Sequence, residues 1–321
     1  MADFLQSLTQ RFARLPLWTQ TACLLAAALA ICGLGADLFG ARLLNDSVQP
    51  DPARVAAYRL DAAALRQLTA SDTGPLRINR LKVAAHATLS FNAFQLVYSD
   101  RRQNSTVLLD TGPDERSRHP ALDEARFEPE ALSRVQREID RARSIYALRA
   151  DSLHLGGIAR SSRAYSARDR LRLNLAQLRS PALIAARFPP AVLEAMRAID
   201  CPELCRFEPG AVRITRGRPD TAWIYLRTAD DRELLLVGNP AIQFERDIVR
   251  AEARSWFHFW RAGLDGREIT AQIFALRELH EQQPRLQIVP VHDEARLQFL
   301  ENSGALRAGF ETVSPFANAS R

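Results

Sequence analysis

Apolar and polar positions divide the chain into an uncharged N-terminal run and a longer region of mixed periodicity. Residues 15–36 contain no charged side chain, and a run of this length is enough to cross the core of a bilayer. Arg11 and Arg14 precede the run, and Asp37 follows it. A cleaved signal peptide is the alternative, but its apolar core usually has only about 7 to 15 residues. The pattern therefore predicts an N-terminal segment, residues 1–14, followed by a single-pass transmembrane helix.

The charges that flank this helix favour an N-terminus in the cytoplasm and a main domain on the other side of the membrane. We therefore expect a protein of a bacterial-type inner membrane with a periplasmic domain. The membrane is one predicted partner of the chain, through its N-terminal helix, and another envelope protein is a second.

The next segment, residues 37–75, has the composition of a linker. It contains Pro50 and Pro52 and one short Ala-rich amphipathic stretch at residues 56–68, which predicts a single helix. The periodicity changes near residue 76, so we expect the folded domain to comprise residues 76–321.

Short apolar runs with alternation predict strands in this domain, and longer runs with a 3.6-residue period predict helices. The expected strands are residues 81–89, 93–98, 106–110, 211–215, 222–227, 233–237 and 286–291, with a polar hairpin turn at 99–104. The expected helices are residues 129–143, 244–260 and 267–282. Strands and helices paired in two successive halves favour an α/β sandwich over a helical bundle or an all-β fold.

The charged residues do not form a basic patch. The chain has 43 basic and 37 acidic residues, a formal net charge of +6, and Lys82 is its only lysine. Arginines and acidic residues alternate along most of the sequence, as in residues 250–254. A nucleic-acid-binding protein would concentrate its basic excess on one face. We therefore expect no nucleic-acid partner.

Four cysteines are too few for a disulfide-dense scaffold. Cys23 and Cys32 lie in the apolar run, where they behave as small hydrophobic residues. Cys201 and Cys205 are spaced C-x-x-x-C, which is compatible with a disulfide in an oxidising compartment, two free thiols or half of a metal site. The metal site is the least supported of the three, because no second cysteine pair lies outside the apolar run.

Four segments occur in an order and spacing that resemble the metallo-β-lactamase-fold hydrolases. They are a strand ending in an Asp-x-Gly turn (107–112), a loop ending in His-x-Gly-Gly (148–157), a strand ending in Gly-Asn (234–239) and a strand end with a histidine (288–293). The resemblance covers roughly residues 76–299. It implies an αβ/βα sandwich and a hydrolase site in which one or two zinc-like ions activate a water molecule.

The resemblance also implies which positions would ligate metal, and most of them are substituted here. The substituted positions are Arg149, Asp151, Leu153, Arg218 and Asn239, whereas His154 and His292 are retained. The candidate ligands are therefore His154, His292, Asp151 and Asn239, the last offering only a neutral carbonyl oxygen. Catalytic zinc usually has three protein ligands, so this set predicts either no metal or one weakly bound divalent ion, Zn, Mn or Fe.

Three functions are compatible with these residues. The first is a membrane-anchored pseudoenzyme, a non-catalytic binding or regulatory module with a degenerate metal site. The second is a divergent single-metal hydrolase that cleaves an ester, lactone or phosphoester, with Asp151 as ligand or general base and Arg149 stabilising the developing oxyanion. The third is an assembly partner in an envelope complex.

The same residues also have purely structural interpretations. His154 and His292 fit hydrogen-bonded histidines of the core, and Asp151 fits a carboxylate that neutralises Arg149. The aromatic run at residues 256–260 fits helix packing, with a lid over a cleft as its alternative.

Overall fold

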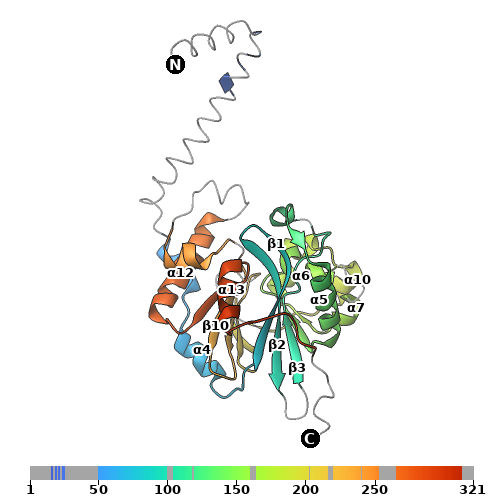
Figure 1. The fold of residues 1–321 in the computed structure, drawn as a ribbon, viewed down its shortest axis with the longest axis vertical. Coiled ribbons are helices and arrows are strands. Elements are labelled where there is room, and N and C mark those ends of the chain that lie inside the picture. The colour runs from blue at the N-terminus through green and yellow to red at the C-terminus, as the bar shows by residue number, and fades with distance from the viewer. Residues whose placement is uncertain are drawn as a thin grey trace. The chain divides into compact units, whose positions relative to one another are not determined.

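The computed structural model describes residues 16, 19, 21, 24–25, 50–99, 104–117, 119–159, 164–201, 203–215, 220–239, 241–252 and 265–312. The chain divides into two compact units, residues 1–49 with 252–267 and residues 50–251 with 268–321. The larger unit contains both β-sheets (Figure 1).

The first sheet of the described residues has seven strands in the order β12-β1-β2-β3-β5-β6, with β4 also paired to β1. Their bounds are β1 Arg77–His86, β2 Leu89–Ser99, β3 Asn104–Leu109, β4 Arg126–Phe127, β5 Ser144–Tyr146, β6 Leu171–Arg172 and β12 Arg307–Ala308. The strands β1, β2 and β3 are antiparallel, and β5 and β6 continue from β3 in parallel.

The second sheet has five strands in the order β11-β10-β9-β8-β7, again within the described residues. Their bounds are β7 Leu204–Glu208, β8 Ala211–Ile214, β9 Trp223–Arg227, β10 Glu233–Val237 and β11 Gln287–Pro290. The pairs are antiparallel except β10 and β11, which are parallel.

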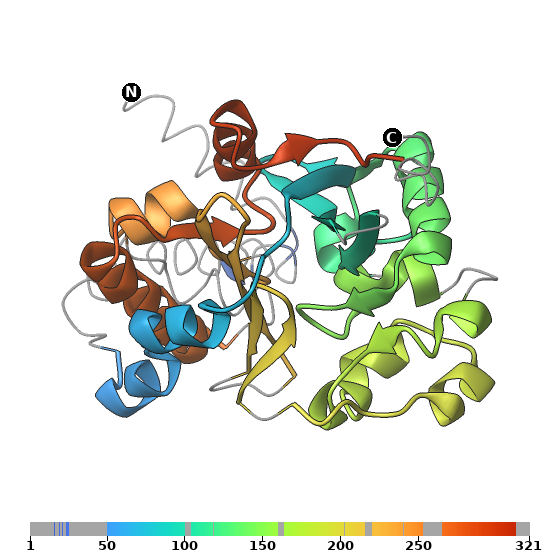
Figure 2. The same cartoon turned by 90° about the horizontal axis from the view of Figure 1, so that it is seen from below.

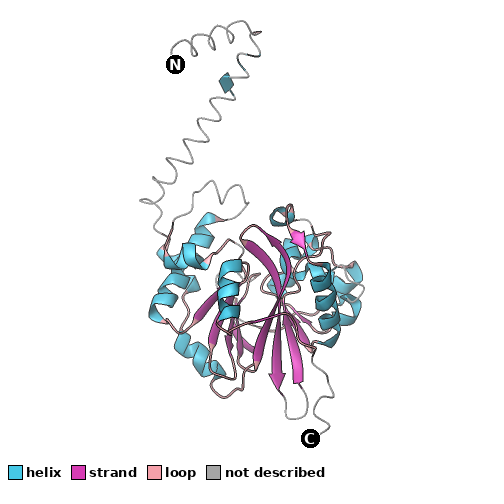
Figure 3. Cartoon of the chain, viewed as in Figure 1, coloured by secondary structure: helices cyan, strands magenta, loops and turns pink. Residues whose placement is uncertain are grey.

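Helices lie on the outer side of each sheet, which gives a helix–sheet–sheet–helix order of layers (Figure 2, Figure 3). Their bounds are α3 Pro52–Tyr58, α4 Ala62–Thr69, α5 Pro129–Arg141, α6 Ser152–Ala159, α7 Ala164–Ala167, α8 Leu175–Leu178, α9 Pro181–Ala185, α10 Pro190–Ala195, α12 Gly266–Gln282 and α13 Glu294–Asn302. A short 3-10 helix covers Pro120–Leu122 and a π-helix covers Phe244–Val249. This mixed α/β fold agrees with the sandwich that the sequence predicts.

Apolar side chains of both sheets meet in one core. Phe94 and Leu96 on β2 belong to this core together with Leu226 on β9 and Leu234 and Leu236 on β10. Strand β2 is buried along nearly its whole length, because it is a central strand with a layer on each side. Ser90, Asn92 and Gln95 interrupt its apolar run, so the sequence alone does not mark this strand as buried on both faces.

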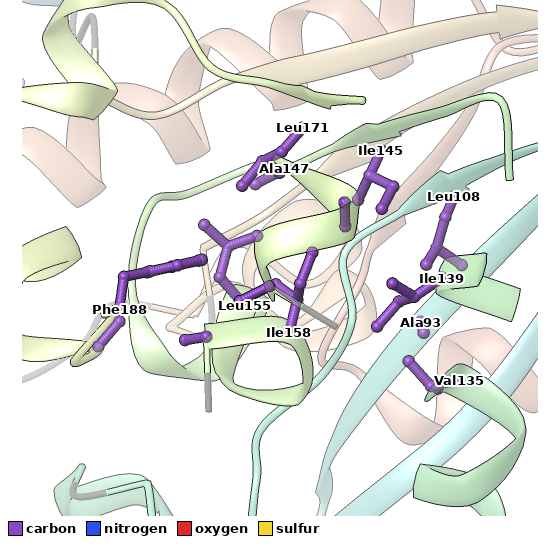
Figure 4. Packing of buried hydrophobic residues seen from close by; sticks show 14 of the residues in the cluster. Ala93, Leu108, Val135, Ile139, Ile145, Ala147, Leu155, Ile158, Leu171 and Phe188 are labelled. Atoms are coloured by element: carbon purple, nitrogen blue, oxygen red, sulfur yellow. The ribbon is translucent and has the colours of Figure 1, made fainter. Parts of the chain in front are cut away.

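A second core lies between the first sheet and its outer helices (Figure 4). Leu108 of β3 and Ile145 of β5 contribute from the sheet, and Val135 and Ile139 contribute from α5. These two residues of α5 are four positions apart and lie on one helical face, which explains why the predicted helix 129–143 forms as α5.

The predicted linker segment forms two helices, α3 and α4, where the sequence predicts one at 56–68. Val55, Tyr58 and Leu65 on these helices are buried. Helix α4 packs against β8 and β9, and the ring of Tyr58 stacks on Trp223 with centroids 5.6 Å apart. Packing on the second sheet stabilises helices that would be marginal alone at this length.

Two further predicted elements differ in the structure, and strands β4 to β7 and β12 and helices α6 to α10 and α13 have no predicted counterpart. The first hairpin turns at residues 87–88, where Ala87 has φ 49°, so β1 starts and ends earlier than residues 81–89. The predicted helix 244–260 is a π-helix over Phe244–Val249, and the aromatic run 256–260 lies outside the described residues.

The predicted transmembrane helix, residues 15–36, also lies almost wholly outside the described residues. No helix in the described part of the chain is long and apolar enough to span a membrane. Cys201 and Cys205 form a disulfide with Cα atoms 5.6 Å apart, so the structure selects the first of the three alternatives for this pair.

Candidate functional site

His154 lies in the first turns of α6, a helix that is buried along its whole length. Its exposed fraction is 1%. The helix packs against the turn after β3, and a Cβ added at Gly157 would lie 2.5 Å from the carbonyl oxygen of Thr111. The backbone N–H of Thr111 in turn donates to the carbonyl of His154 at 2.7 Å. The glycine is therefore required by the close approach that fixes His154 in place.

Asp110 orients the imidazole of His154. It follows β3, has φ 56° and is 1% exposed. Its Oδ1 accepts from the backbone N–H of Leu148 at 2.9 Å, and its Oδ2 lies 2.8 Å from Nδ1 of His154. Burial raises the pKa of Asp110. Burial alone would lower the pKa of His154, but the carboxylates of Asp110 and Asp151 raise it overall.

His292 follows β11 and faces His154 across the core. Its Nδ1 lies 3.0 Å from the carbonyl oxygen of Ser90, and it is 2% exposed. Because a carbonyl only accepts, Nδ1 of His292 carries the proton and Nε2 presents a lone pair. Burial, together with the nearby charge of His154, lowers the pKa of His292 to about 3.

The two imidazoles point their Nε2 atoms at each other, 3.4 Å apart. When Asp110 accepts from Nδ1 of neutral His154, both Nε2 atoms present lone pairs to one point. Two nitrogen ligands of one tetrahedral zinc, each about 2.0–2.1 Å from the ion, lie about 3.4 Å apart. When His154 is cationic, its Nε2–H is directed at the lone pair of His292 instead. The pair therefore suits either one shared ion or one shared proton.

Asp151 and Arg149 lie beside this pair but are bonded to other groups. Oδ1 of Asp151 accepts from the backbone N–H groups of Leu153 and His154 at 3.0 and 3.2 Å, which caps α6. Its Oδ2 lies 3.3 Å from Nε of Arg149. Burial acts to raise the pKa of Asp151, but the charges of His154 and Arg149 lower it overall. Asp151 is thus a carboxylate near the histidines whose two oxygens already have partners.

Asn239 is bonded to the turn after β10 and to α12. Its Oδ1 accepts from the N–H of Ala241 at 3.0 Å, and its Nδ2 donates to Oε1 of Gln272 at 3.1 Å. The preceding residue, Gly238, passes close to the site: an added Cβ would lie 2.6 Å from Cβ of Leu148 and 3.4 Å from the ring of His154. The chain therefore passes close to His154 at Gly238, while the amide of Asn239 serves local structure.

Leu153 and Arg218 are the two remaining substituted positions. Leu153 packs in a small apolar cluster with Phe91 and Leu122, and Arg218 lies outside the described residues. Among the residues that the structure describes, no group of three or more His, Cys, Asp or Glu could hold a metal ion.

His119 is a neighbour of the site that the sequence prediction missed. It precedes the 3-10 helix, and its Nδ1 accepts from the N–H of Ala121 at 3.1 Å. Burial lowers the pKa of His119, and the charges of Asp151, Arg149 and His154 also act on it. No pattern in the sequence marks this histidine, because it lies in an irregular segment between β3 and β4.

No protein-family model and no curated protein sequence matches this chain. Among solved structures, it is similar to a quorum-quenching N-acyl homoserine lactone hydrolase, with 15% identity, a TM-score of 0.51 and coverage of 76% of this chain and 99% of that chain. A second such hydrolase, with N-hexanoyl-L-homoserine bound at its catalytic metal centre, shows 14% identity, a TM-score of 0.50 and coverage of 76% and 100%. The Rm3 metallo-β-lactamase shows 14% identity, a TM-score of 0.38 and coverage of 80% and 92%. The two similarities with TM-scores of 0.50 and 0.51 show that the chain has the mixed α/β fold of these lactone hydrolases.

Proposed function

We propose that this chain is a divergent hydrolase of the metallo-β-lactamase fold that binds one divalent ion on His154 and His292 and cleaves an ester, lactone or phosphoester. The observation that carries the proposal is the 3.4 Å separation of the two Nε2 atoms, with each Nδ1 held by a separate acceptor. Metal-binding histidines characteristically donate their other ring N–H to a carboxylate or a carbonyl, which fixes the tautomer. Asp110 and Ser90 serve that role here.

The donor set fits one ion and does not fit two. Two imidazoles suit zinc or iron better than manganese, and a second ion would need further anionic ligands. The carboxylate of Asp151 and the amide of Asn239 are both engaged elsewhere. Arg149 adds a fixed positive charge beside the pair, which opposes a second cation. Weak binding of a single ion is therefore expected.

The residues around the ion would divide the chemistry among them. A bound ion would polarise a carbonyl or phosphoryl oxygen and lower the pKa of its water ligand. Arg149, whose side chain is 22% exposed, would stabilise the negative charge that develops on the substrate oxygen. Asp151 would hold Arg149 in place through the Nε of that arginine.

Zinc binding tests the ligand assignment. We expect the full chain in detergent to bind about one zinc ion by calorimetry, and His154→Gln and His292→Gln each to weaken binding at least about tenfold. His86→Gln is the matched control, because His86 is a half-exposed histidine at the end of β1. Equal zinc affinity in all four proteins would overturn the assignment.

A substrate panel tests the activity. We expect hydrolysis of at least one ester, lactone or phosphoester in the presence of zinc, manganese or iron, with loss of turnover in Arg149→Gln at unchanged zinc affinity. If the chain binds zinc but turns over none of these substrates, the hydrolase proposal fails and the ligand assignment stands.

A non-catalytic binding or regulatory module is the second candidate function. It is favoured by the closure of the site, since His154 and His292 are at most 2% exposed, and by the structural bonds of Asp151 and Asn239. This candidate predicts no turnover of any ester, lactone or phosphoester with zinc, manganese or iron. It also predicts an unchanged zinc affinity in Arg149→Gln.

The membrane anchor is a further proposal that rests on the sequence. The uncharged run 15–36 supports an anchored protein, and the disulfide of Cys201 and Cys205 supports a domain in an oxidising compartment such as the periplasm. Fractionation of cells that express the full chain or residues 37–321 tests the anchor, and co-purification from detergent tests for an envelope partner. Equal release of both proteins without detergent would contradict the anchor.

A further inference from the structure

Arg213 is a buried arginine in the second sheet. It lies on β8, is 1% exposed, and is directly opposite Cys205 on β7 and Ile224 on β9. Residues directly opposite on antiparallel strands point to the same side of a sheet. Ile224 belongs to the core between the two sheets, so the side chain of Arg213 enters this core.

The guanidinium of Arg213 has one neutral partner. Its Nη2 donates to Oε1 of Gln177, while Nε and Nη1 are buried and have no hydrogen-bond partner among the residues that the structure describes. Gln177 cannot supply a negative charge, and its own groups are used: Oε1 also accepts from the N–H of Asn174 at 3.3 Å, and Nε2 donates to the carbonyl of Ala147 at 3.0 Å. Two nitrogen atoms of the guanidinium, Nε and Nη1, thus lack an acceptor among the described residues.

No carboxylate compensates this charge among the described residues, where no ion pair involves Arg213. Cys205, across the strand pair, is bonded to Cys201 and therefore carries no charge. Burial lowers the pKa of Arg213 to about 10, which still leaves it cationic at neutral pH. A buried cation is strongly unfavourable unless a counter-charge and hydrogen bonds accompany it.

We propose that Arg213 and Gln177 form the polar end of a buried site for a compact monovalent anion such as chloride. One cation matches one negative charge, and the three N–H groups of Nε and Nη1 suffice for a halide. A multi-oxygen anion such as sulfate would bring four acceptors into a core that offers few further donors, so its binding is disfavoured. This site is independent of the histidine pair and of any metal there.

The response of thermal stability to chloride tests the site. The full chain in detergent is melted without reductant at fixed ionic strength while gluconate is replaced by chloride up to about 0.2 M. We expect the midpoint to rise by about 3 to 6 °C for the wild type and to stay flat for Arg213→Met. Arg206→Met is the matched control, because Arg206 is an exposed arginine of β7 paired with Asp72, and it should keep the response. A flat wild-type response, or the same rise in Arg213→Met, would overturn the proposal.

Bromide locates the anion directly and does not depend on the folding of any variant. Crystals of the wild-type chain soaked in bromide should show an anomalous peak within hydrogen-bond distance of Nε or Nη1 of Arg213. A map with ordered side chains and no peak there would equally overturn the proposal.

Discussion

The histidine pair and Arg213 both place ionisable nitrogen atoms in the protein interior, yet their surroundings differ. Asp110 and Ser90 bond the Nδ1 atoms of the two histidines, and only the facing Nε2 atoms are left for a ligand. In Arg213, Nε and Nη1 have no hydrogen-bond partner among the described residues, and Nη2 donates to the neutral amide of Gln177. In the histidine pair, only the facing Nε2 atoms lack a bond, and they mark the position of a ligand. At Arg213, the positive charge has no described counter-charge, so we expect an anion to bind there.

The largest expected effect is the loss of the partner that completes the histidine site. Asp110→Ala removes the acceptor of two N–H groups and places alanine at φ 56°. We expect the free energy of unfolding to fall by about 3–5 kcal/mol in urea titrations followed by circular dichroism. Asp110→Asn keeps an acceptor for Leu148 and tolerates this φ, so it should lose less. A change below about 1 kcal/mol in Asp110→Ala would contradict the contrast with Arg213.

Arg213→Met should raise the free energy of unfolding, whereas Asp110→Ala should lower it. Replacing an unpaired buried cation with an apolar side chain of similar length removes a desolvation cost, so in gluconate we expect a gain of about 1–4 kcal/mol in the free energy of unfolding. Chloride should reduce this difference in the free energy of unfolding between variant and wild type, because it stabilises the wild type alone. Urea titrations in the two buffers measure both quantities, and a loss of stability in both would show that Arg213 is well paired.

Asn239→Asp tests whether residue 239 borders the ion that the two histidines would bind. The change replaces the donor to Gln272 with an acceptor, so we expect a cost of about 1–3 kcal/mol in stability. If residue 239 borders the ion, the added carboxylate should tighten zinc binding about tenfold. Asn239→Leu is the control, with a similar cost and no gain in affinity. Unchanged zinc binding in Asn239→Asp would separate residue 239 from the ion site.

The smallest expected effect concerns an ion pair nearer the surface, Arg66 with Glu233. Their atoms are 2.6 and 2.8 Å apart, and Tyr225 also donates to Glu233. Burial would raise the pKa of Glu233, but the bonds from Arg66 and Tyr225 lower it below its usual 4.5. Its contribution is therefore present above pH 4.5 and lost as the pH falls through the lowered pKa. Arg66 is exposed enough that this contribution is about 0.5–1 kcal/mol. Between pH 7 and pH 3, Arg66→Gln should lose less stability than the wild type by that amount, and equal losses would contradict the assignment.

Much of the fold follows from local pattern, and the exceptions have one cause. Strands β8 to β11 of the second sheet lie within a residue or two of their predicted positions, because their apolar runs are buried, whereas the partly exposed β7 was not predicted. Helices α3 and α4 were not both predicted, because their stability depends on Trp223 and the strands beneath them. Contacts between segments far apart in the sequence leave no periodic signal in either segment.

The candidate site shows the same division. The retained His154 and His292 could be predicted from the order of the segments that contain them, and the structure places them side by side. The sequence did not predict the bonds of Asp151 and Asn239 or the approach of His119 to the site. The partners of these residues are decided by turns and packing. The lack of a described ionic partner for Arg213 could not be predicted either, since its surroundings are set by β7, β9 and α8.

The sequence by itself determined the order of the four segments at 107–112, 148–157, 234–239 and 288–293, the two histidines that they retain and the replacement of most acidic and imidazole positions around them. The tertiary structure decided which nitrogen of each ring is free. The acceptor of His154 lies 44 residues before it and that of His292 lies 202 residues before it. A tautomer depends on the hydrogen bond that the other nitrogen makes, and only the folded chain brings those acceptors within reach.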